Sequence, residues 1–288
     1  MNFKDTQRLP AKQSLKMQSA EKQLIYLYCV TAASPTLKEA VKLASDLYFV
    51  YSVDLYAIVS KVAESEFGEE SLKANMADLE WVKTKISLHE KVIEAVMTNT
   101  CVIPFKFATL FSTEESLKAM LTKYAEEFKA ILEKLKNKEE WGVKIYCDTG
   151  RLRQSLANNN PELLEIGNKI GSSSVGTAYF LKKKKDELIK DMLNNKISEC
   201  GQESFELLKE LSVEACLNKL LPKEVTEREE DMVLNSAFLV NKLEVDDFIN
   251  MVDNLRMNCE GQGFSFDCTG PWPPYNFCRL PKEKTQSG

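Results

Sequence analysis

The chain has 288 residues, of which 44% are hydrophobic and 28% charged, and its formal net charge at pH 7 is −5. This composition is that of an ordinary globular protein with room for one large or two ordinary domains. The acidic excess argues against nucleic acid as an obligatory partner, because nucleic-acid binders usually carry a basic excess that offsets phosphate charge. No apolar run approaches the roughly 20 residues that cross a bilayer, so we expect no membrane partner.

Both ends of the chain are predicted to be flexible tails, over residues 1–22 and 279–288. The first 22 residues scatter charges every few positions and hold no apolar segment, which excludes a secretory signal and predicts a cytoplasmic protein. In that compartment the eight cysteines are expected to be reduced thiols, most of them small core residues, rather than a disulfide framework. They form no C-x-x-C pair, and the sequence predicts no metal site and no cofactor.

Residues 23–138 are predicted to form an N-terminal α+β domain. In order, its elements are a strand at 23–30, a helix at 37–47, a strand at 54–63, a long helix after Gly68, a strand at 101–107 and a helix from Thr113 to about Lys136. The first strand is apolar on both alternating faces, which is typical of a strand buried on both sides. Pro104 cannot donate a ladder hydrogen bond, so its strand is expected at a sheet edge. The long helix carries one apolar stripe, made of Leu79, Val82, Ile86, Ile93 and Val96.

Residues 139–278 are predicted to form a second domain, joined to the first through the charged stretch at 136–140. Its elements are a strand at 141–148, a helical stretch at 161–219 with breaks at 171–176 and near Gly201, a strand at 233–240, a helix at 245–257 and a strand at 264–268. This β-α-β-α-β order is part of the ferredoxin-like pattern. We therefore expect an α+β fold of two domains, the C-terminal one ferredoxin-like in modified form, with antiparallel or mixed sheets and helices on one face of each.

The segment at 269–277, TGPWPPYNF, is the most unusual part of the chain. Three prolines within four positions fix φ and block a helix, so the segment must be extended or turned. It directly follows the last predicted strand, which makes it an extended Pro-rich C-terminal strap. Its aromatic side chains either pack on the body of the protein or face a partner, and the area that aromatic rings bury favours packing.

The strap closely resembles the G-P-W-P-P-Y-x-F signature that closes the gas vesicle GvpF/GvpL family. Other blocks are similar to that family in the same order: DLYAIVSKV at 54–62, DLEWVKTKISLHEKVIEAVM at 78–97, VIPFKFATLF at 102–111, GTAYFLKKK at 176–184 and LNSAFLV at 234–240. The resemblance covers roughly residues 24–277, and several blocks in correct order make a specific signal. It leaves open whether the chain is the F or the L paralogue.

The resemblance implies a non-enzymatic accessory protein that acts in gas vesicle assembly and is associated with gas vesicles in the cytoplasm. Its main partner would be the small hydrophobic shell protein, and other gas vesicle accessory proteins would be further partners. A shell subunit that presents an apolar face to gas would aggregate in water, so escort, nucleation and a minor structural role all fit.

We expect the strap and the edge strand to shape the surface that binds this partner, although a structural role inside the monomer is at least as well supported for each. The candidate partner-binding residues are Trp272, Pro273, Pro274, Tyr275 and Phe277 of the strap, and Pro104, Phe105 and Lys106 of the edge strand.

Two further features are expected to be structural. His89 is the lone histidine and faces the apolar stripe, while Glu90 points away from it on the helix, which predicts a hydrogen-bonded histidine without a catalytic or metal role. The run Lys182–Lys185 is interpreted as a solvated face, with docking to an acidic surface of a partner as the alternative.

The alternative functional class is a ferredoxin-like small-ligand sensor or an uncharacterised enzyme. It would need a deep pocket with converging polar groups near Tyr146, Asp148 or Arg151. The sequence holds no nucleophile elbow and no H-E-x-x-H motif, and the Gly/Ser-rich stretch at 171–176 lacks the phosphate-loop pattern. We therefore expect a protein that is not an enzyme.

Overall fold

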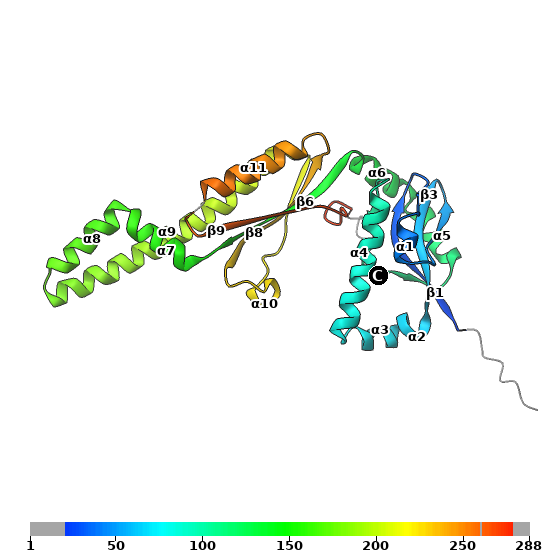
Figure 1. Cartoon of the computed structure of the whole chain (residues 1–288), viewed down its shortest axis with the longest axis horizontal. Helices are drawn as coiled ribbons and strands as arrows, with labels where there is room; N and C mark the ends of the chain where they lie inside the picture. The colour runs from blue at the N-terminus through cyan, green and yellow to red at the C-terminus, as the bar shows by residue number, and fades with distance from the viewer. Residues whose placement is uncertain (1–20, 260, 279–288) are drawn as a thin grey trace, which may run out of the picture.

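The structure of the protein, a computed structural model, describes residues 21–259 and 261–278. The tails predicted at 1–22 and 279–288 therefore lie almost wholly outside the described residues. Two antiparallel sheets, each packed with its own helices, follow one another along an elongated molecule (Figure 1). The strand order is β2-β3-β1-β4 in the first sheet, where β5 also pairs with β1, and β7-β8-β6-β9 in the second.

The first sheet consists of β1 (Gln23–Thr31), β2 (Tyr48–Ser52), β3 (Leu55–Ala63), β4 (Ile103–Pro104) and β5 (Leu110–Phe111). Strand β1 is buried from Ile25 to Thr31, as its two-faced apolar pattern predicts. Pro104 lies in β4, which pairs with β1 and ends the strand order, so the edge position predicted for this proline is confirmed.

Helices cover both faces of the first sheet, so the prediction of helices on one face is wrong here. On one side pack α1 (Ala40–Leu43) and α4 (Leu79–Met97), and on the other α5 (Glu114–Lys123) and α6 (Ala125–Leu135), while α2 (Glu64–Phe67) and α3 (Glu69–Asn75) lead from β3 to α4. The reason lies in β1, whose successive side chains point to opposite faces. Ile25 and Leu27 enter the α5–α6 core, whereas Tyr26 and Tyr28 enter the α4 core.

The apolar stripe predicted for α4 is correct only in the second half of the helix. Ile93 and Val96 are buried, but Leu79 is 71% exposed and Ile86 is 37% exposed. The first turns of α4 pack through Trp81 instead, whose ring centroid lies 5.5 Å from that of Phe67 in α2. The spacing of apolar residues identified one face of α4. How much of that face is buried depends on where the helix crosses the first sheet.

The second sheet consists of β6 (Lys138–Cys147), β7 (Glu214–Leu217), β8 (Asp231–Asn241) and β9 (Phe264–Trp272). Its helices are α7 (Thr149–Asn159), α8 (Pro161–Ser172), α9 (Val175–Glu210), α10 (Lys223–Thr226) and α11 (Val245–Asn258). Helices α9 and α11 pack on one face, where Phe248 and Val252 of α11 contact the core that includes Val143 and Phe238.

Several predicted boundaries in the second half are wrong. The linker proposed at 136–140 is largely strand, because β6 starts at Lys138. The helical stretch at 161–219 ends at Glu210 and is followed by the edge strand β7, and no break occurs near Gly201. The break at 171–176 is confirmed, since α8 ends at Ser172 and the Ser174 side chain caps α9.

Candidate functional site

The strap leaves β9 and turns back between the second sheet and α4 (Figure 1). Its first part belongs to the sheet, since β9 runs to Trp272 rather than ending at residue 268 as predicted. Pro273, Pro274 and Phe277 are buried, Tyr275 is half-buried, and Trp272 remains 43% exposed. The strap therefore packs mainly on the body of the protein, and most of its side chains are inaccessible to a partner in this conformation.

Tyr275 reaches α4 and Phe105, the residue that follows β4, and joins a buried hydrogen-bond network around His89. The Tyr275 hydroxyl lies 3.0 Å from Oε1 of Glu90, to which it donates, and 3.3 Å from Nε2 of His89. His89 Nε2 donates to the Phe105 carbonyl at 3.0 Å, and His89 Nδ1 accepts from the Tyr26 hydroxyl at 2.9 Å. These partners assign the proton of the neutral imidazole to Nε2.

Burial keeps His89 uncharged. Desolvation of the ring lowers the pKa of His89 to about 4, against a smaller opposing effect of the hydrogen bond to the Phe105 carbonyl. The hydrogen bonds predicted for this histidine are confirmed. Glu90 was predicted to point away from His89 on the helix, but Tyr275 from the far end of the chain bridges the two side chains.

Asn276 holds the strap to the first residues of β6. Its backbone N–H donates to Oε2 of Glu140 at 3.1 Å, and its side-chain Nδ2 donates to Oε1 of Glu140 at 2.7 Å. Glu140 is 4% exposed, and desolvation raises its pKa to about 7, while the two hydrogen bonds from Asn276 act in the opposite direction. A buried carboxyl group with both oxygens bonded to one residue fixes the strap in register with β6.

Phe277 closes the contact between the two sheets. It is 4% exposed and packs in a cluster with Leu135 at the end of α6 and with Ala237 and Leu239 of β8. Leu135 belongs to the helix layer of the first sheet and the other two residues to the second, so this ring ties both halves together.

Gly270 allows the strap to pass close to Trp141. Its φ is +153°, and a Cβ there would lie 2.9 Å from two ring carbons of Trp141 and 3.0 Å from the Glu140 carbonyl oxygen.

We expect Gly270→Ala to lower the free energy of unfolding by about 1–3 kcal/mol, because only glycine adopts this conformation readily. Urea unfolding measures the loss. Gly176→Ala is the matched control, since no atom lies within 4 Å of its added Cβ, and an equal loss in both variants would contradict the steric explanation.

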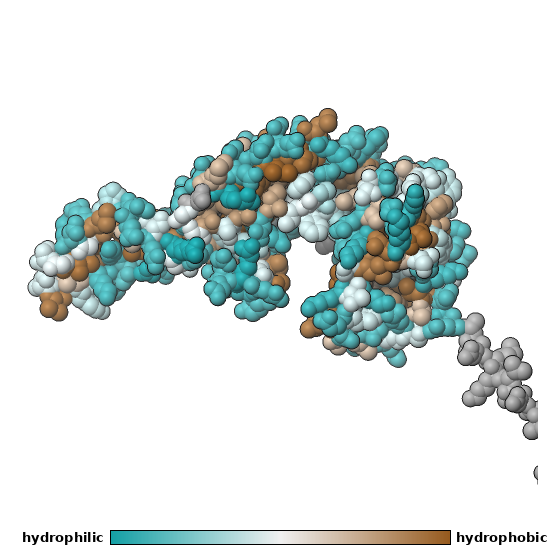
Figure 2. Space-filling model, viewed as in Figure 1, coloured by the Kyte–Doolittle hydropathy of each residue, from teal (hydrophilic) through white to brown (hydrophobic). Residues whose placement is uncertain are grey.

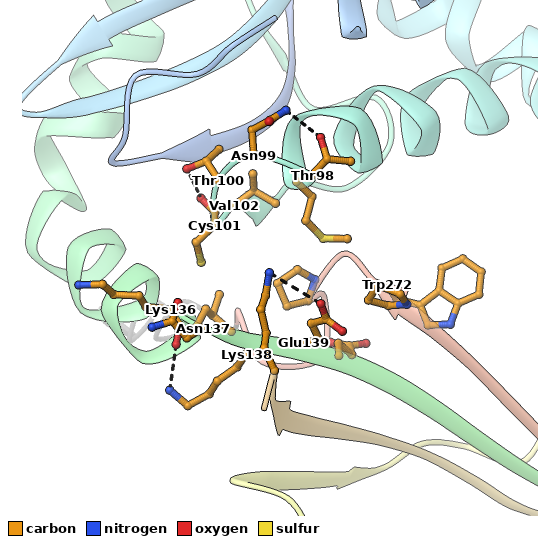
Figure 3. A pocket seen from close by; sticks show the side chains of 16 residues that line it. Thr98, Asn99, Thr100, Cys101, Val102, Lys136, Asn137, Lys138, Glu139 and Trp272 are labelled. Atoms are coloured by element: carbon orange, nitrogen blue, oxygen red, sulfur yellow. Dashed lines mark hydrogen bonds and ion pairs between the residues drawn. The ribbon is translucent and has the colours of Figure 1, made fainter. Parts of the chain in front are cut away.

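A cleft of about 500 Å³ opens where the two halves meet (Figure 3). Its walls are residues 97–102 at the end of α4, residues 135–140 between α6 and β6, Lys242, and Pro271, Trp272 and Pro274 of the strap. We call it the junction cleft. Trp272 stands at its rim, with the indole Nε1 donating to Thr269 Oγ1 at 3.0 Å, so its position is set while part of its ring stays open to solvent.

The lining of the junction cleft combines apolar side chains with three lysines, Lys136, Lys138 and Lys242. Lys242 Nζ lies 3.7 Å from Glu139 Oε1, and Lys138 Nζ donates to the Lys134 carbonyl at 2.7 Å. Sequence reasoning missed Lys242, which follows the predicted strand at 233–240. It also missed Lys138, Glu139 and Glu140, because they fall in the charged stretch at 136–140 that was interpreted as a linker. Nothing in that stretch marks Glu140 as buried, since its burial comes from the strap far away in the sequence.

The two sets of candidate residues meet at one place. The Tyr275 hydroxyl lies 3.4 Å from the Phe105 carbonyl, which brings the strap to the edge strand. Pro104 is buried, whereas Lys106 is exposed and does not line the junction cleft. Of the eight candidates, Trp272 and Lys106 therefore present the most open side chains.

The region proposed for the alternative class contains a hollow of about 590 Å³ lined by Asp148 and Arg151 but not by Tyr146. These polar groups are engaged with their neighbours: Asp148 caps α7 and lies 3.2 Å from Arg151, and Arg228 covers the Tyr146 ring at 4.2 Å. No observation favours a ligand there. Within residues 21–259 and 261–278, no group of three or more His, Cys, Asp or Glu side chains is placed to hold a metal ion, and no helix is long and apolar enough to cross a membrane.

Comparison with known proteins supports the resemblance over the whole fold. The family model described as gas vesicle synthesis protein GvpL/GvpF matches residues 24–279. Gas vesicle protein L of Streptomyces sp. (strain CB03234) is 26% identical over 241 residues, which are 80% of this chain and 82% of the relative. Gas vesicle protein L1 of Halobacterium salinarum is 25% identical over 260 residues, or 88% and 89% of the two chains.

Solved structures share the fold. The crystal structure of gas vesicle protein GvpF from Anabaena sp. PCC7120 superposes with a TM-score of 0.65 at 18% identity, over 90% of this chain and 99% of that one. GvpF from Microcystis aeruginosa gives a TM-score of 0.60 at 19% identity, over 89% and 99%. With a family model spanning nearly all described residues and the same fold in its relatives, this chain belongs to the GvpL/GvpF family of gas vesicle synthesis proteins and has a role in gas vesicle formation.

Proposed function

We propose that the protein acts in gas vesicle assembly by binding the small hydrophobic shell protein at the junction cleft. The observation that carries this proposal is Trp272, a large aromatic side chain left 43% exposed at the rim of a cleft that both halves build. Tryptophan is enriched among the residues that carry most of the binding energy of interfaces. The protein would work as an escort, a nucleation factor or a minor structural component, without changing a covalent bond.

Three features support a fixed binding surface there. Thr269 orients the Trp272 indole, Gly270 lets the strap pack closely on Trp141, and the buried Glu140 holds Asn276. A preorganised surface loses little side-chain freedom on binding, so more of the contact energy appears as affinity. Lys106 and the edge strand β4 lie outside the cleft and would form a second, peripheral contact.

The same proposal places the protein in the cytoplasm, on growing gas vesicles. Other gas vesicle accessory proteins would be further partners, whereas neither nucleic acid nor a membrane is expected. An apolar shell subunit must be shielded from water until it enters the wall, which is the task this proposal assigns to the cleft.

We also infer that the chain consists of two domains, at 23–138 and 139–278. The strand order β7-β8-β6-β9, with antiparallel neighbours and helices α9 and α11 on one face, supports a modified ferredoxin-like architecture for the second domain. The strap would then serve as the connection that closes the second domain onto the first.

Replacing Trp272 by Ala should weaken binding to the shell protein by about thirtyfold, the equivalent of about 2 kcal/mol, which is the loss at an aromatic residue that carries much of the binding energy. Purified protein titrated with shell protein held in mild detergent gives the dissociation constant, and circular dichroism checks that the fold is retained. Phe49→Ala is the matched control, because Phe49 is also 43% exposed but lies on β2, outside the junction cleft.

Unchanged affinity of the Trp272→Ala variant, with the fold intact, would reject the junction cleft as the binding surface. If Phe49→Ala loses binding instead, the partner pairs with the open edge of the first sheet. In cells that lack any redundant copy, the Trp272→Ala gene should restore fewer gas vesicles than the Phe49→Ala gene.

A further inference from the structure

The outer part of the second half is a helical hairpin of α8 and α9 that projects away from both sheets (Figure 1). Between Val175 and Lys190, Ile189 is the one buried side chain of α9. Further along the same helix, Cys200, Ser204 and Leu208 are buried, and Cys200 and Leu208 belong to the core of the second sheet. The projecting half of α9 therefore contributes little to the core and is free to meet another molecule.

The end of this hairpin exposes apolar side chains that nothing in the described chain covers. Val175 is 90% exposed, Phe180 is 71% exposed and Tyr179 is 67% exposed, and the rings of Tyr179 and Phe180 pack edge to face at 5.9 Å. Figure 2 shows hydrophobic surface at this outer end. Single exposed apolar residues are ordinary, but three within six positions at a protruding end mark an interaction surface.

The same end of the hairpin is basic, although the whole chain is acidic. Residues 164–185 hold five lysines and one glutamate, whereas the chain carries a net charge of −5. Lys182, Lys183 and Lys184 are exposed, and no ion pair within the described residues engages them. We call Val175, Tyr179, Phe180 and Lys182–Lys184 the basic tip.

A surface of opposite charge and similar apolar content lies on the second sheet, around β7 and α10. Leu217 and Val225 are each 61% exposed, and Leu220 is 49% exposed. Residues 224–231 hold five carboxylates and one arginine. We call Leu217, Leu220, Val225, Glu224, Glu227 and Glu229 the acidic segment.

The carboxylates of the acidic segment are available to a partner. The two nearby cations already form ion pairs with other carboxylates. Arg228 Nη2 lies 3.0 Å from Asp267 Oδ2, and Lys223 Nζ lies 3.2 Å from Asp231 Oδ1. Glu224, Glu227 and Glu229 are exposed, and among the described side chains none forms an ion pair with them. Among the residues that the structure describes, no ion pair engages these three carboxylates or the three tip lysines.

We propose that the basic tip of one copy of this chain docks on the acidic segment of a second copy. Within one chain the two surfaces cannot meet, because the tip lies at the outer end of the hairpin and α10 lies beneath the second sheet (Figure 1). The contact is heterologous, since different surfaces meet, so each copy keeps one free tip or one free acidic segment and further copies add head to tail.

The size of the two surfaces sets the strength of the association. A handful of apolar side chains and three charge pairs make an interface below the area of stable complexes, with dissociation constants in the micromolar range or weaker. Exposed charge pairs are screened by salt, so association should weaken steeply as ionic strength rises. Such a contact acts where copies are concentrated, as on one assembling structure.

The test uses the full-length protein in sedimentation velocity at increasing concentration, at low and at high salt. The wild type should associate at low salt and return to monomer at high salt. A tip variant with Lys182→Glu, Lys183→Glu and Lys184→Glu, and a segment variant with Glu224→Lys, Glu227→Lys and Glu229→Lys, should each stay monomeric. Phe180→Ser should weaken association about tenfold, whereas Leu243→Ser, which removes a side chain that is 98% exposed elsewhere, should not.

Mixing the two charge-reversed variants shows whether each fails to associate because its charges repel or because it is misfolded. In the mixture, the reversed tip of one variant faces the reversed segment of the other, and the unchanged tip of the second faces the unchanged segment of the first. Both contacts are complementary, so the mixture should recover association at low salt. A wild type that remains monomeric over the whole concentration range overturns the proposal, as does association that survives in both variants. If the tip variant is monomeric like the wild type but loses the shell protein, the tip belongs to that interface instead.

Discussion

Replacing Phe277 by Ala is expected to lower the free energy of unfolding by about 3–5 kcal/mol, the range for a buried phenylalanine cut back to a methyl group. Phe277 is 4% exposed and fills the space between Leu135 of α6 and Leu239 of β8. These neighbours belong to a helix of the first half and a strand of the second half, and they cannot both collapse into the hole, which places the loss toward the upper end. Urea unfolding followed by tryptophan fluorescence measures it.

Phe277→Leu is the control for this prediction, because it keeps an apolar side chain of intermediate size and should cost about 1 kcal/mol. If Phe277→Ala also loses less than about 1 kcal/mol, the strap contributes nothing to the stability of the body. If both variants lose the full amount, the aromatic ring itself is required and not the volume that it fills.

The second large expected effect concerns how the free energy of unfolding depends on pH. Two side chains contribute opposite pH dependences, which offset each other in the wild-type protein. The pKa of His89 falls from 6.5 to about 4 on folding, so the folded state binds fewer protons and stability is lost as pH falls from 6.5 toward 4. The pKa of Glu140 rises from 4.5 to about 7, so the folded state binds more protons and stability is lost as pH rises from 4.5 toward 7. Between pH 4.5 and 6.5 the two slopes cancel.

Replacing either titrating side chain should expose the pH dependence that the other contributes to the free energy of unfolding. In Glu140→Gln the free energy of unfolding should rise with pH between 5 and 6.5, by about 2 kcal/mol, since one proton corresponds to about 1.4 kcal/mol per pH unit. In His89→Gln it should fall over the same window by a similar amount. Glutamine keeps the size of each side chain, although at position 140 it gives up one acceptor for Asn276.

Urea unfolding of the wild type and both variants at several pH values between 5 and 7 gives the free energy of unfolding as a function of pH. Glu90, whose pKa is also raised by burial, adds the same dependence to every variant and cancels in their differences. Parallel curves for wild type and both variants would mean that neither side chain titrates with a shifted pKa. Opposite slopes would establish that the strap is held by a neutral His89 and a carboxyl that prefers its proton.

Local sequence patterns predicted the secondary structure correctly where a residue type allows only one backbone conformation. Pro104 required an edge strand and occupies one, and the Gly/Ser-rich stretch at 171–176 predicted the break between α8 and α9. The strand at 23–30 and the start of a helix at Thr113 were also recognisable, because capping and apolar period depend on near neighbours. The single helix predicted to run to about Lys136 divides at Tyr124 into α5 and α6.

Elements without a local signal were missed. Strand β2 forms a hairpin with β3 through Val53 and Asp54, both at positive φ, although tight hairpin turns usually carry Asn-Gly or Asp-Gly. A β-branched residue such as Val53 gives no sign of that conformation. Strand β7 was hidden at the end of a long helical pattern, and it exists because the edge of β8 offers it hydrogen-bond partners.

By itself, the sequence determined the family, the mixed helix-and-sheet class and the non-helical backbone of residues 269–277, because motif order and proline geometry are properties of the chain alone. Tertiary structure alone decided which strap residues are available to a partner. Phe277 and Tyr275 are withdrawn into contacts with α6 and α4, residues more than a hundred positions away, while Trp272 stays at the rim of the junction cleft. Burial depends on what packs against a side chain, and such distant neighbours leave no trace in the local pattern.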